Sequence, residues 1–140
     1  MKITICGSLT FSNEMLQAKE DLEKMGHRVV IPKDAPDVAL GKHDNDNLED
    51  DYQRCVESDI MRTHFRLIEN GDAILVINKE KNNIEGYIGT ATLMEIGLAY
   101  YLGKKIFLLN SPPHHSEQRW AHEIRIIQPK ILNGDLNEIS

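Results

Sequence analysis

Hydrophobic positions along the chain follow two alternating patterns, one typical of buried strands and one typical of amphipathic helices. Short apolar runs rich in β-branched residues predict strands, and turn residues such as glycine, proline and asparagine follow them. The expected strands cover residues 2–6, 27–32, 72–78, 104–110 and 125–132. Apolar side chains three and four residues apart predict helices over residues 12–26, 49–71 and 89–103, and a shorter helix within 111–124. Residues 33–48 are rich in Pro, Gly, Asn and Asp and are expected to form a long mobile loop.

The alternation of strands and helices predicts an α/β fold built on a parallel sheet. Right-handed crossovers put helices on both faces, which gives a flavodoxin/Rossmann-like three-layer sandwich. With five strands, the expected order is 2-1-3-4-5. The chain has 140 residues and shows neither a linker nor an internal repeat, so residues 1–140 are expected to form a single domain.

Charge and composition narrow the partners of this domain. The formal net charge of −6 is not the basic footprint that nucleic-acid binding requires, so no nucleic-acid partner is expected. Apolar runs are too short to cross a membrane or to form a signal peptide. The two cysteines, Cys6 and Cys55, form neither a disulfide framework nor a metal motif. Both are interpreted as small core residues of a cytoplasmic protein.

Three segments are expected to meet at the carboxyl ends of the central strands, where sheets of this kind bind ligands. They are the turn after the first strand, the loop over residues 79–88 and the start of the helix over 89–103. The turn contains small, polar and flexible residues that suit contact with an anion, namely Gly7, Ser8, Leu9 and Thr10. The sequence therefore predicts a ligand site between this turn and the helix.

Glu95 is the only charged side chain in the apolar helix predicted over residues 89–103. A carboxylate is costly to bury without a partner, so Glu95 either pairs with a cation or serves chemistry. Gly89, Thr90 and Thr92 open the same helix, and the free N–H groups of a helix start bind phosphate and other anions. Because this start faces the predicted ligand side, we favour a functional carboxylate over a structural ion pair.

Several other polar side chains are weaker candidates. His64 lies on the inward face of the helix predicted over 49–71, where a structural and a functional histidine fit the pattern equally well. Glu85 and Tyr87 precede the Glu95 helix, and either could line the site, although a solvated Glu85 is the simpler interpretation. The histidines of residues 111–124 lack the spacing of a metal motif, so no metal or other cofactor is expected.

Three segments resemble a known family. "ICGS" after the first strand, "GDAILVIN" in the third and "GTATLMEIGLAYYLGKKIFLLN" are similar to the nucleoside 2-deoxyribosyltransferase-like superfamily over roughly residues 2–110. That superfamily includes deoxynucleoside 5′-monophosphate N-glycosidases. The resemblance implies that Glu95 attacks C1′ of a nucleotide or nucleoside and displaces the base. The glycosyl-enzyme that forms then passes its sugar to water or to another base.

Two acidic residues of the family pattern are replaced in this chain. His64 stands eight residues before Asp72, where the family usually has an aspartate, and Gly89 stands where the transferases have another. The resemblance therefore implies two alternatives. Either Tyr87 or His64 assists Glu95 by positioning or protonation, or the chain binds nucleotides without turnover. Gly89 and Thr90 favour a 5′-phosphate, and hence a nucleotide N-glycosidase over a base-exchanging transferase.

A second resemblance points to the same class of reaction. "GTATLME" is similar to the Gly-x-Gly-Thr-x-x-Glu signature of the cytokinin-activating phosphoribohydrolases, with Ala91 in place of the second glycine. Those enzymes also cut an N-glycosidic bond in a nucleoside monophosphate. Their usual Pro-Gly-Gly lead-in is replaced here by other residues.

The helix over 89–103 is also expected to mediate self-association. It carries more apolar side chains than one contact with a sheet can bury, namely Met94, Leu98, Tyr101 and Leu102. We therefore expect a homodimer or a higher homo-oligomer. The resemblance to the family implies the same, because its members form dimers or larger assemblies.

Overall fold

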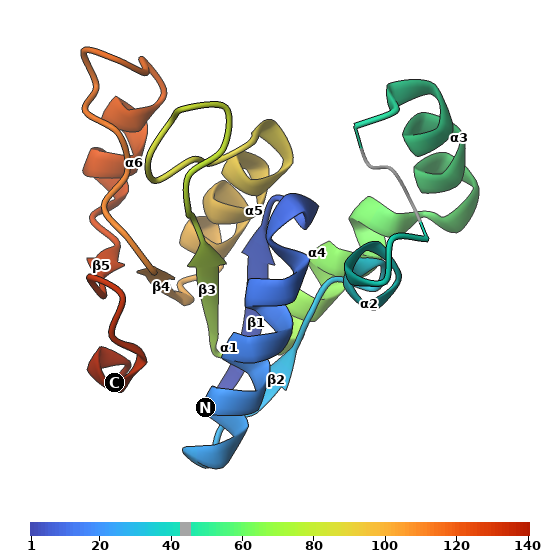
Figure 1. The fold of residues 1–140 in the computed structure, drawn as a ribbon. Coiled ribbons are helices and arrows are strands. Elements are labelled where there is room, and N and C mark those ends of the chain that lie inside the picture. Colours follow the sequence, from blue (N-terminus) through green and yellow to red (C-terminus); the bar gives the residue numbers. More distant parts are fainter. Residues whose placement is uncertain (43–45) are drawn as a thin grey trace.

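The computed structural model describes residues 1–42 and 46–140 of the chain. Within these residues a single parallel sheet runs in the order β2-β1-β3-β4-β5, which confirms the predicted fold class and strand order. Helices lie on both faces of this sheet (Figure 1). The strands are β1 (Lys2–Gly7), β2 (Arg28–Val30), β3 (Ala73–Ile77), β4 (Lys105–Leu108) and β5 (Lys130–Ile131). The helices are α1 (Ser12–Lys24), α2 (Ala35–Ala39), α3 (Leu48–Ser58), α4 (Ile60–Asn70), α5 (Thr90–Tyr101) and α6 (Ala121–Ile127), with short 3-10 turns η1 (Leu9–Phe11) and η2 (Leu136–Glu138).

Alternate side chains of the central strands point to opposite faces of the sheet and enter two separate hydrophobic clusters. Ile3 and Ile5 of β1 pack with α1 on one face. Cys6 packs on the other face, together with Ile68 of α4 and Ile96 of α5. Because successive residues of a strand alternate in this way, Cys6, near the carboxyl end of β1, points toward the helices α4 and α5.

The helix predicted over residues 49–71 is two helices, and this corrects the sequence prediction. Asp59 adopts a left-handed conformation with φ of 49°, which ends α3 and starts α4. Aspartate tolerates this conformation better than most residues do, so a break here costs little. The break allows α4 to lie against the sheet, while no side chain of α3, all of whose residues are described, is buried.

The loop predicted over residues 33–48 is also partly wrong. It contains the short helix α2, which begins with a proline in its first turn, where the missing N–H of proline costs nothing. The loop ends at Asn47, whose side chain accepts a hydrogen bond from the N–H of Asp50 and caps α3. The part of the prediction that concerns residues 43–45 lies outside the described residues.

The strand predicted over residues 125–132 is shorter than expected. Residues up to Ile127 continue α6, which ends where Gln128 takes a left-handed conformation with φ of 58°. Apolar residues in this segment suit a helix packed on the sheet as well as a strand within it, so periodicity alone did not separate the two. Only Lys130–Ile131 pair with β4.

Helix α5 does not bury its whole surface, although its sequence is apolar nearly all round. Met94 is 44% exposed and Tyr101 is 85% exposed, whereas Leu98 and Leu102 are half-buried. Self-association through this face stays a prediction. Among the helices in the described part of the chain, none is both long and apolar enough to cross a membrane.

A pair of asparagines joins the carboxyl ends of β3 and β4. Asn78, which is fully buried, donates from Nδ2 to the carbonyl of Asn110 at 2.7 Å and accepts from the N–H of Asn110 at 2.9 Å. Asn110 returns a side-chain hydrogen bond to the carbonyl of Asn78 at 3.1 Å. These contacts fix the edge of the sheet from which the loop over residues 79–88 departs.

We expect Asn78→Ala to destabilise the protein, because it leaves partly buried backbone groups of Asn110 without these partners. The free energy of unfolding should fall by about 2–3 kcal/mol in urea denaturation. Gln17→Ala, which removes only an exposed side-chain hydrogen bond to Asp21, should change it by less than about 0.5 kcal/mol. Equal effects of the two variants would contradict a structural role for the asparagine pair.

Candidate active site

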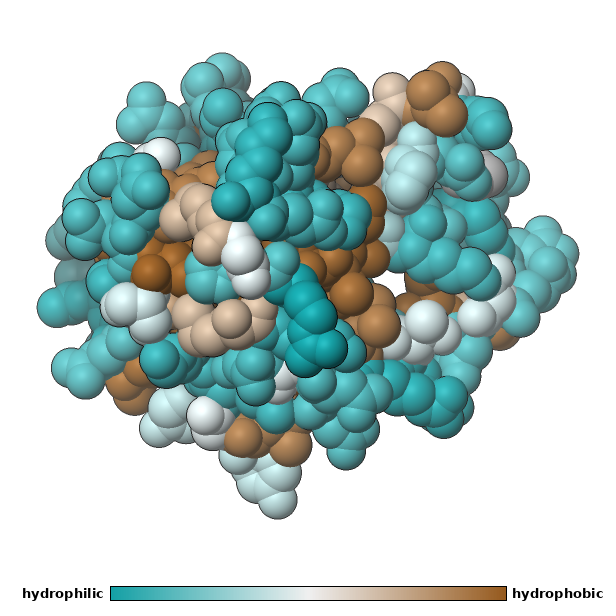
Figure 2. Space-filling view, turned by 90° about the horizontal axis from the view of Figure 1, so that it is seen from below, coloured by the Kyte–Doolittle hydropathy of each residue, from teal (hydrophilic) through white to brown (hydrophobic). Residues whose placement is uncertain are grey.

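A large cavity opens between the carboxyl end of β1, the helices α3 and α4, and the start of α5. Its volume is about 720 Å³, within the range of pockets that hold nucleotide-sized ligands. Figure 2, which views the molecule from below, at the amino ends of the strands, shows an opening in the surface with hydrophobic residues along one edge. The lining combines apolar side chains with a few acids and includes Gly7, Leu9, Ala91, Thr92, His64 and Glu95.

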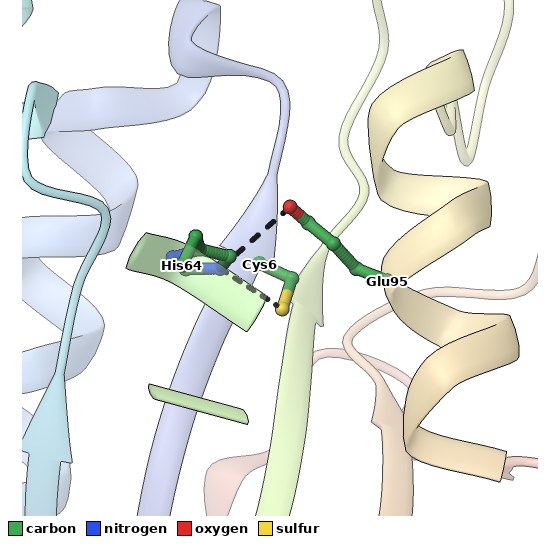
Figure 3. Close-up of side chains that lie close together, drawn as sticks. All are labelled: Cys6, His64 and Glu95. Carbon is green, nitrogen blue, oxygen red and sulfur yellow. Dashed lines mark hydrogen bonds and ion pairs between the residues drawn. The ribbon is translucent and has the colours of Figure 1, made fainter. Parts of the chain in front are cut away.

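Three side chains from three different elements meet beside this cavity, two of them in its lining and one buried behind it (Figure 3). They are Cys6 of β1, His64 of α4 and Glu95 of α5. The Cys6 sulfur lies 3.5 Å from Nε2 of His64, and the same Nε2 lies 3.8 Å from a carboxylate oxygen of Glu95. The donor atoms of all three lie within 4.8 Å of one another.

Burial controls the charge of these groups. Removal from water raises the pKa of Glu95 from 4.5 to about 7, and a hydrogen bond from Cys6 offsets only part of this shift. The same loss of water lowers the pKa of His64 from 6.5 to about 4, so its imidazole is neutral at neutral pH. Burial also raises the pKa of the Cys6 thiol well above its ordinary value, so the thiol keeps its proton. The contact between His64 and Glu95 is therefore not an ion pair at neutral pH.

The hydrogen bonds within this group do not satisfy all its polar atoms. The Cys6 thiol has one proton, for which Nε2 of His64 and the Glu95 carboxylate compete. Nε2 and the Glu95 oxygen are too far apart at 3.8 Å for a direct hydrogen bond. Nδ1 of His64 is buried and has no hydrogen-bond partner among the described residues. A buried polar atom without a partner is costly, so the arrangement is not explained by packing alone.

Helix α3 forms the outer wall of the cavity. Leu48, Tyr52 and Val56 line the cavity although each is more than 60% exposed. Arg54 ties this helix to the rest of the domain, since its Nε lies 3.2 Å from Asp34. A terminal nitrogen of Arg54 also lies 3.0 Å from Asp51, one turn earlier in α3. The cavity therefore has an apolar outer wall. The ion pair between Arg54 and Asp34 holds this wall, helix α3, beside the start of α2.

The turn after β1 is shaped by contact with β3. Gly7 has φ of +144°, and a Cβ on it would lie 2.7 Å from the carbonyl oxygen of Ile77. Only glycine fits there without a shift of the backbone. The next residue, Ser8, accepts a hydrogen bond from Nζ of Lys81 at 3.2 Å, and this ammonium group also lies 5.4 Å from the centre of the Tyr87 ring. A cation thus stands beside the turn.

The structure brings some of the predicted site residues to the cavity and leaves others beside it. Gly7, Leu9, Thr92, His64 and Glu95 line the cavity. The remaining candidates lie outside its lining: Ser8, Thr10, Tyr87, Gly89 and Thr90.

Sequence reasoning missed three residues of the site. From the sequence, Cys6 is interpreted as an ordinary core residue, and Lys81 and Tyr52 are not singled out. In the structure, Cys6 belongs to the site because it lies close to both His64 and Glu95. Lys81 belongs to it because it donates a hydrogen bond to Ser8. Only the alternation of β1 offered a signal, because it places Cys6 on the face opposite Ile5.

Comparison with solved structures identifies proteins of the same fold. A 2-deoxyribosyltransferase from Bacillus psychrosaccharolyticus matches with a TM-score of 0.55 and 19% identity, covering 81% of this chain and 75% of its own. A 2-deoxyribosyltransferase from Leishmania mexicana matches with a TM-score of 0.53 and 18% identity, covering 83% and 69%. The CMP N-glycosidase BcmB of Clostridium botulinum matches with a TM-score of 0.52 and 19% identity, covering 99% and 93%.

These matches support the resemblance to the nucleoside 2-deoxyribosyltransferase-like superfamily at the level of the fold. At 18–19% identity, the matches show that the chain has the fold of these proteins. No family model matches the chain, and no curated protein matches it significantly.

The pKa shifts make opposite contributions to stability. Between pH 4.5 and about 7, the folded protein holds a proton on Glu95 that the unfolded chain has lost, so stability falls as pH rises through this window. Between about 4 and 6.5, the unfolded chain protonates His64 while the folded protein does not, so stability falls as pH falls. The two contributions oppose each other where the windows overlap.

We therefore expect Glu95→Gln to stabilise the protein at pH 8 and not at pH 4, because only the ionised carboxylate is penalised by burial. The gain at pH 8 should be about 2–3 kcal/mol, measured by urea denaturation in metal-free buffers. The control is Glu69→Gln, which removes an exposed glutamate at the far end of α4. An equal gain for Glu95→Gln at both pH values would contradict the raised pKa.

Proposed function

We propose that this protein cleaves or transfers at the N-glycosidic bond of a nucleoside 5′-monophosphate or nucleoside, with Glu95 as the nucleophile. The observation that carries the proposal is the position of Glu95. Its carboxyl is desolvated, lies at the wall of a cavity large enough for a nucleotide and occupies the position of the nucleophile in the motif that resembles the family. The shared fold supports the same class of reaction.

Desolvation suits this carboxyl to attack at C1′. A carboxylate with few water contacts needs little solvent reorganisation as it approaches a sugar carbon that develops positive charge. In the first step Glu95 bonds to C1′, the bond between C1′ and the base breaks, and the base leaves with the electron pair and takes up a proton from water in the cavity. The glycosyl ester that results is the intermediate of a retaining glycosidase.

We assign His64 to the second step. Its low pKa keeps it neutral, and a neutral imidazole can accept a proton at Nε2 from the water that attacks C1′. Nε2 lies on the side of the ring that faces Glu95, 3.8 Å from its carboxylate oxygen. Water attack then releases the sugar and restores Glu95, which gives hydrolysis. A second base in place of water gives transfer.

A 5′-phosphate would lie at the turn after β1. Lys81 supplies a positive charge beside Ser8, and the start of α5 supplies N–H groups without partners within the helix. Lys81 also makes an ion pair with Asp46 at 3.5 Å, which a phosphate would replace with a doubly charged partner. The ring of Tyr87 lies beside Lys81 and Gly89, so Tyr87 positions this end of the site.

The base would lie against α3. Tyr52 and Val56 offer an aromatic and an apolar surface to a planar ring, while Asp34 and Asp51 stand nearby as acceptors for amino or hydroxyl groups. This arrangement leaves C1′ between the base at α3 and the phosphate at Lys81, close to Glu95.

We expect Glu95→Gln to abolish release of free base. The assay is chromatography of ribo- and deoxyribonucleosides and their 5′-monophosphates, and the rate on the best substrate should fall by roughly three orders of magnitude or more. Glu69→Gln, the same change on the outside of α4, should leave the rate unchanged. Full activity of Glu95→Gln would contradict the proposal. If no compound of the panel releases base but nucleotides still raise the melting temperature, the result would instead favour a binding module without turnover.

Lys81→Ala should weaken the use of nucleotides specifically, because it removes the charge expected to face the 5′-phosphate. The KM for a nucleoside 5′-monophosphate should rise about tenfold or more, while the KM for the matching nucleoside should change little. Lys24→Ala removes an exposed lysine of α1 that pairs with Glu20, and should affect neither substrate. An equal loss for both substrates would contradict a phosphate contact at Lys81.

A further inference from the structure

The group of Cys6, His64 and Glu95 combines a sulfur, an imidazole nitrogen and a carboxylate oxygen at one point. These three donor types are the ones that bind zinc in proteins. Each comes from a different element, so the sheet and two helices hold them in place. Cys6 is fully buried and His64 is 7% exposed, which excludes most competing water from the group.

The distances between these donors are close to those of a bound metal. Zinc bound tetrahedrally by sulfur at about 2.3 Å and nitrogen at about 2.05 Å places these two atoms about 3.5 Å apart. The sulfur of Cys6 and Nε2 of His64 are separated by this distance, 3.5 Å. A nitrogen and an oxygen ligand would lie about 3.4 Å apart. Nε2 and the Glu95 oxygen, at 3.8 Å, need to approach by only a few tenths of an ångström.

The side of the group that faces the cavity is open. His64 and Glu95 both line the cavity, so water or another small ligand can reach a metal held between them. Three protein ligands and one open position are the arrangement of a reactive zinc site rather than a closed structural one. Nδ1 of His64, which is unpartnered among the described residues, would carry the proton in the tautomer that leaves Nε2 free to bind.

We propose that Cys6, His64 and Glu95 bind one zinc ion and that bound zinc switches off the glycosidase by occupying the nucleophile. Binding exchanges protons for metal: the thiol of Cys6 and the carboxyl of Glu95, where protonated, release their protons as zinc–sulfur and zinc–oxygen bonds form. The oxidation state of zinc does not change. Zinc binding stands on the geometry alone, whereas the inhibition rests on the function proposed above.

The test for binding uses cobalt(II), whose spectrum reports its ligands. Protein freed of metal with a chelator is titrated with cobalt chloride, and we expect a sulfur-to-cobalt charge-transfer band that saturates at one ion per chain. One equivalent of zinc should then remove the band, because zinc binds more tightly at a tetrahedral site that contains sulfur. Absence of the band in folded protein would overturn the proposal.

Variants locate the site. Cys6→Ser should abolish the band, and Glu95→Gln should keep the band but weaken cobalt binding by at least about tenfold. Cys55→Ser is the matched control, because Cys55 is the other thiol and lines the same cavity from α3. It should keep the band unchanged. A band lost in Cys55→Ser and kept in Cys6→Ser would overturn the assignment. Circular dichroism of each variant confirms folding, and Glu95→Gln serves if Cys6→Ser does not fold.

Base release in the same preparations tests the inhibition. Metal-free protein should be active, zinc should stop the release at the concentration that displaces cobalt, and a chelator should restore it. Activity that zinc leaves unchanged, despite a saturated site, would overturn the inhibition. A cobalt band without base release in the metal-free protein would mean that the proposed function fails while the metal site stands. Base release without a band would mean the reverse.

Discussion

A carboxyl group kept away from water at the wall of a large cavity is the constraint on which this site depends. Glu95 lies on the inner face of α5, and no lysine or arginine among the described residues forms an ion pair with it. Its neighbours are a thiol and a neutral imidazole, which moderate its charge without cancelling it. The protein holds this group ready to ionise near neutral pH at the cost of some stability, as active sites often do.

The fold produces this constraint through the alternation of one strand and the position of two helices. Ile3 and Ile5 point toward α1, so Cys6 must point toward α4 and α5. Thr4 donates a hydrogen bond to the carbonyl of Leu67 at 3.1 Å and fixes α4 against β1, with His64 nearly one turn before that carbonyl. The close approach of Gly7 to Ile77 then turns the chain away and leaves room for a ligand above the group.

Most of the fold was predictable because its patterns are local, whereas the site depends on contacts between distant segments. The strand order followed from alternating apolar runs, and Glu95 stood out as one charge in an apolar helix. The break at Asp59 was missed because helical periodicity continues across it on both sides. Cys6 was missed because a buried thiol in a strand looks like core until the tertiary structure places an imidazole beside it.

The same donors can serve covalent chemistry and metal binding because both need an unprotonated nucleophile in a dry pocket. A proton, a sugar carbon and a zinc ion compete for the Glu95 carboxylate. The one whose bond to the carboxylate has the most favourable free energy occupies it. Cys6 lowers the affinity of Glu95 for the proton through its hydrogen bond, and it adds a ligand only for the metal, since its protonated thiol offers the sugar no electrons. A serine at this position would still donate a hydrogen bond to Glu95 but would bind zinc poorly. Cys6 is therefore the residue that separates the two chemistries of the pocket.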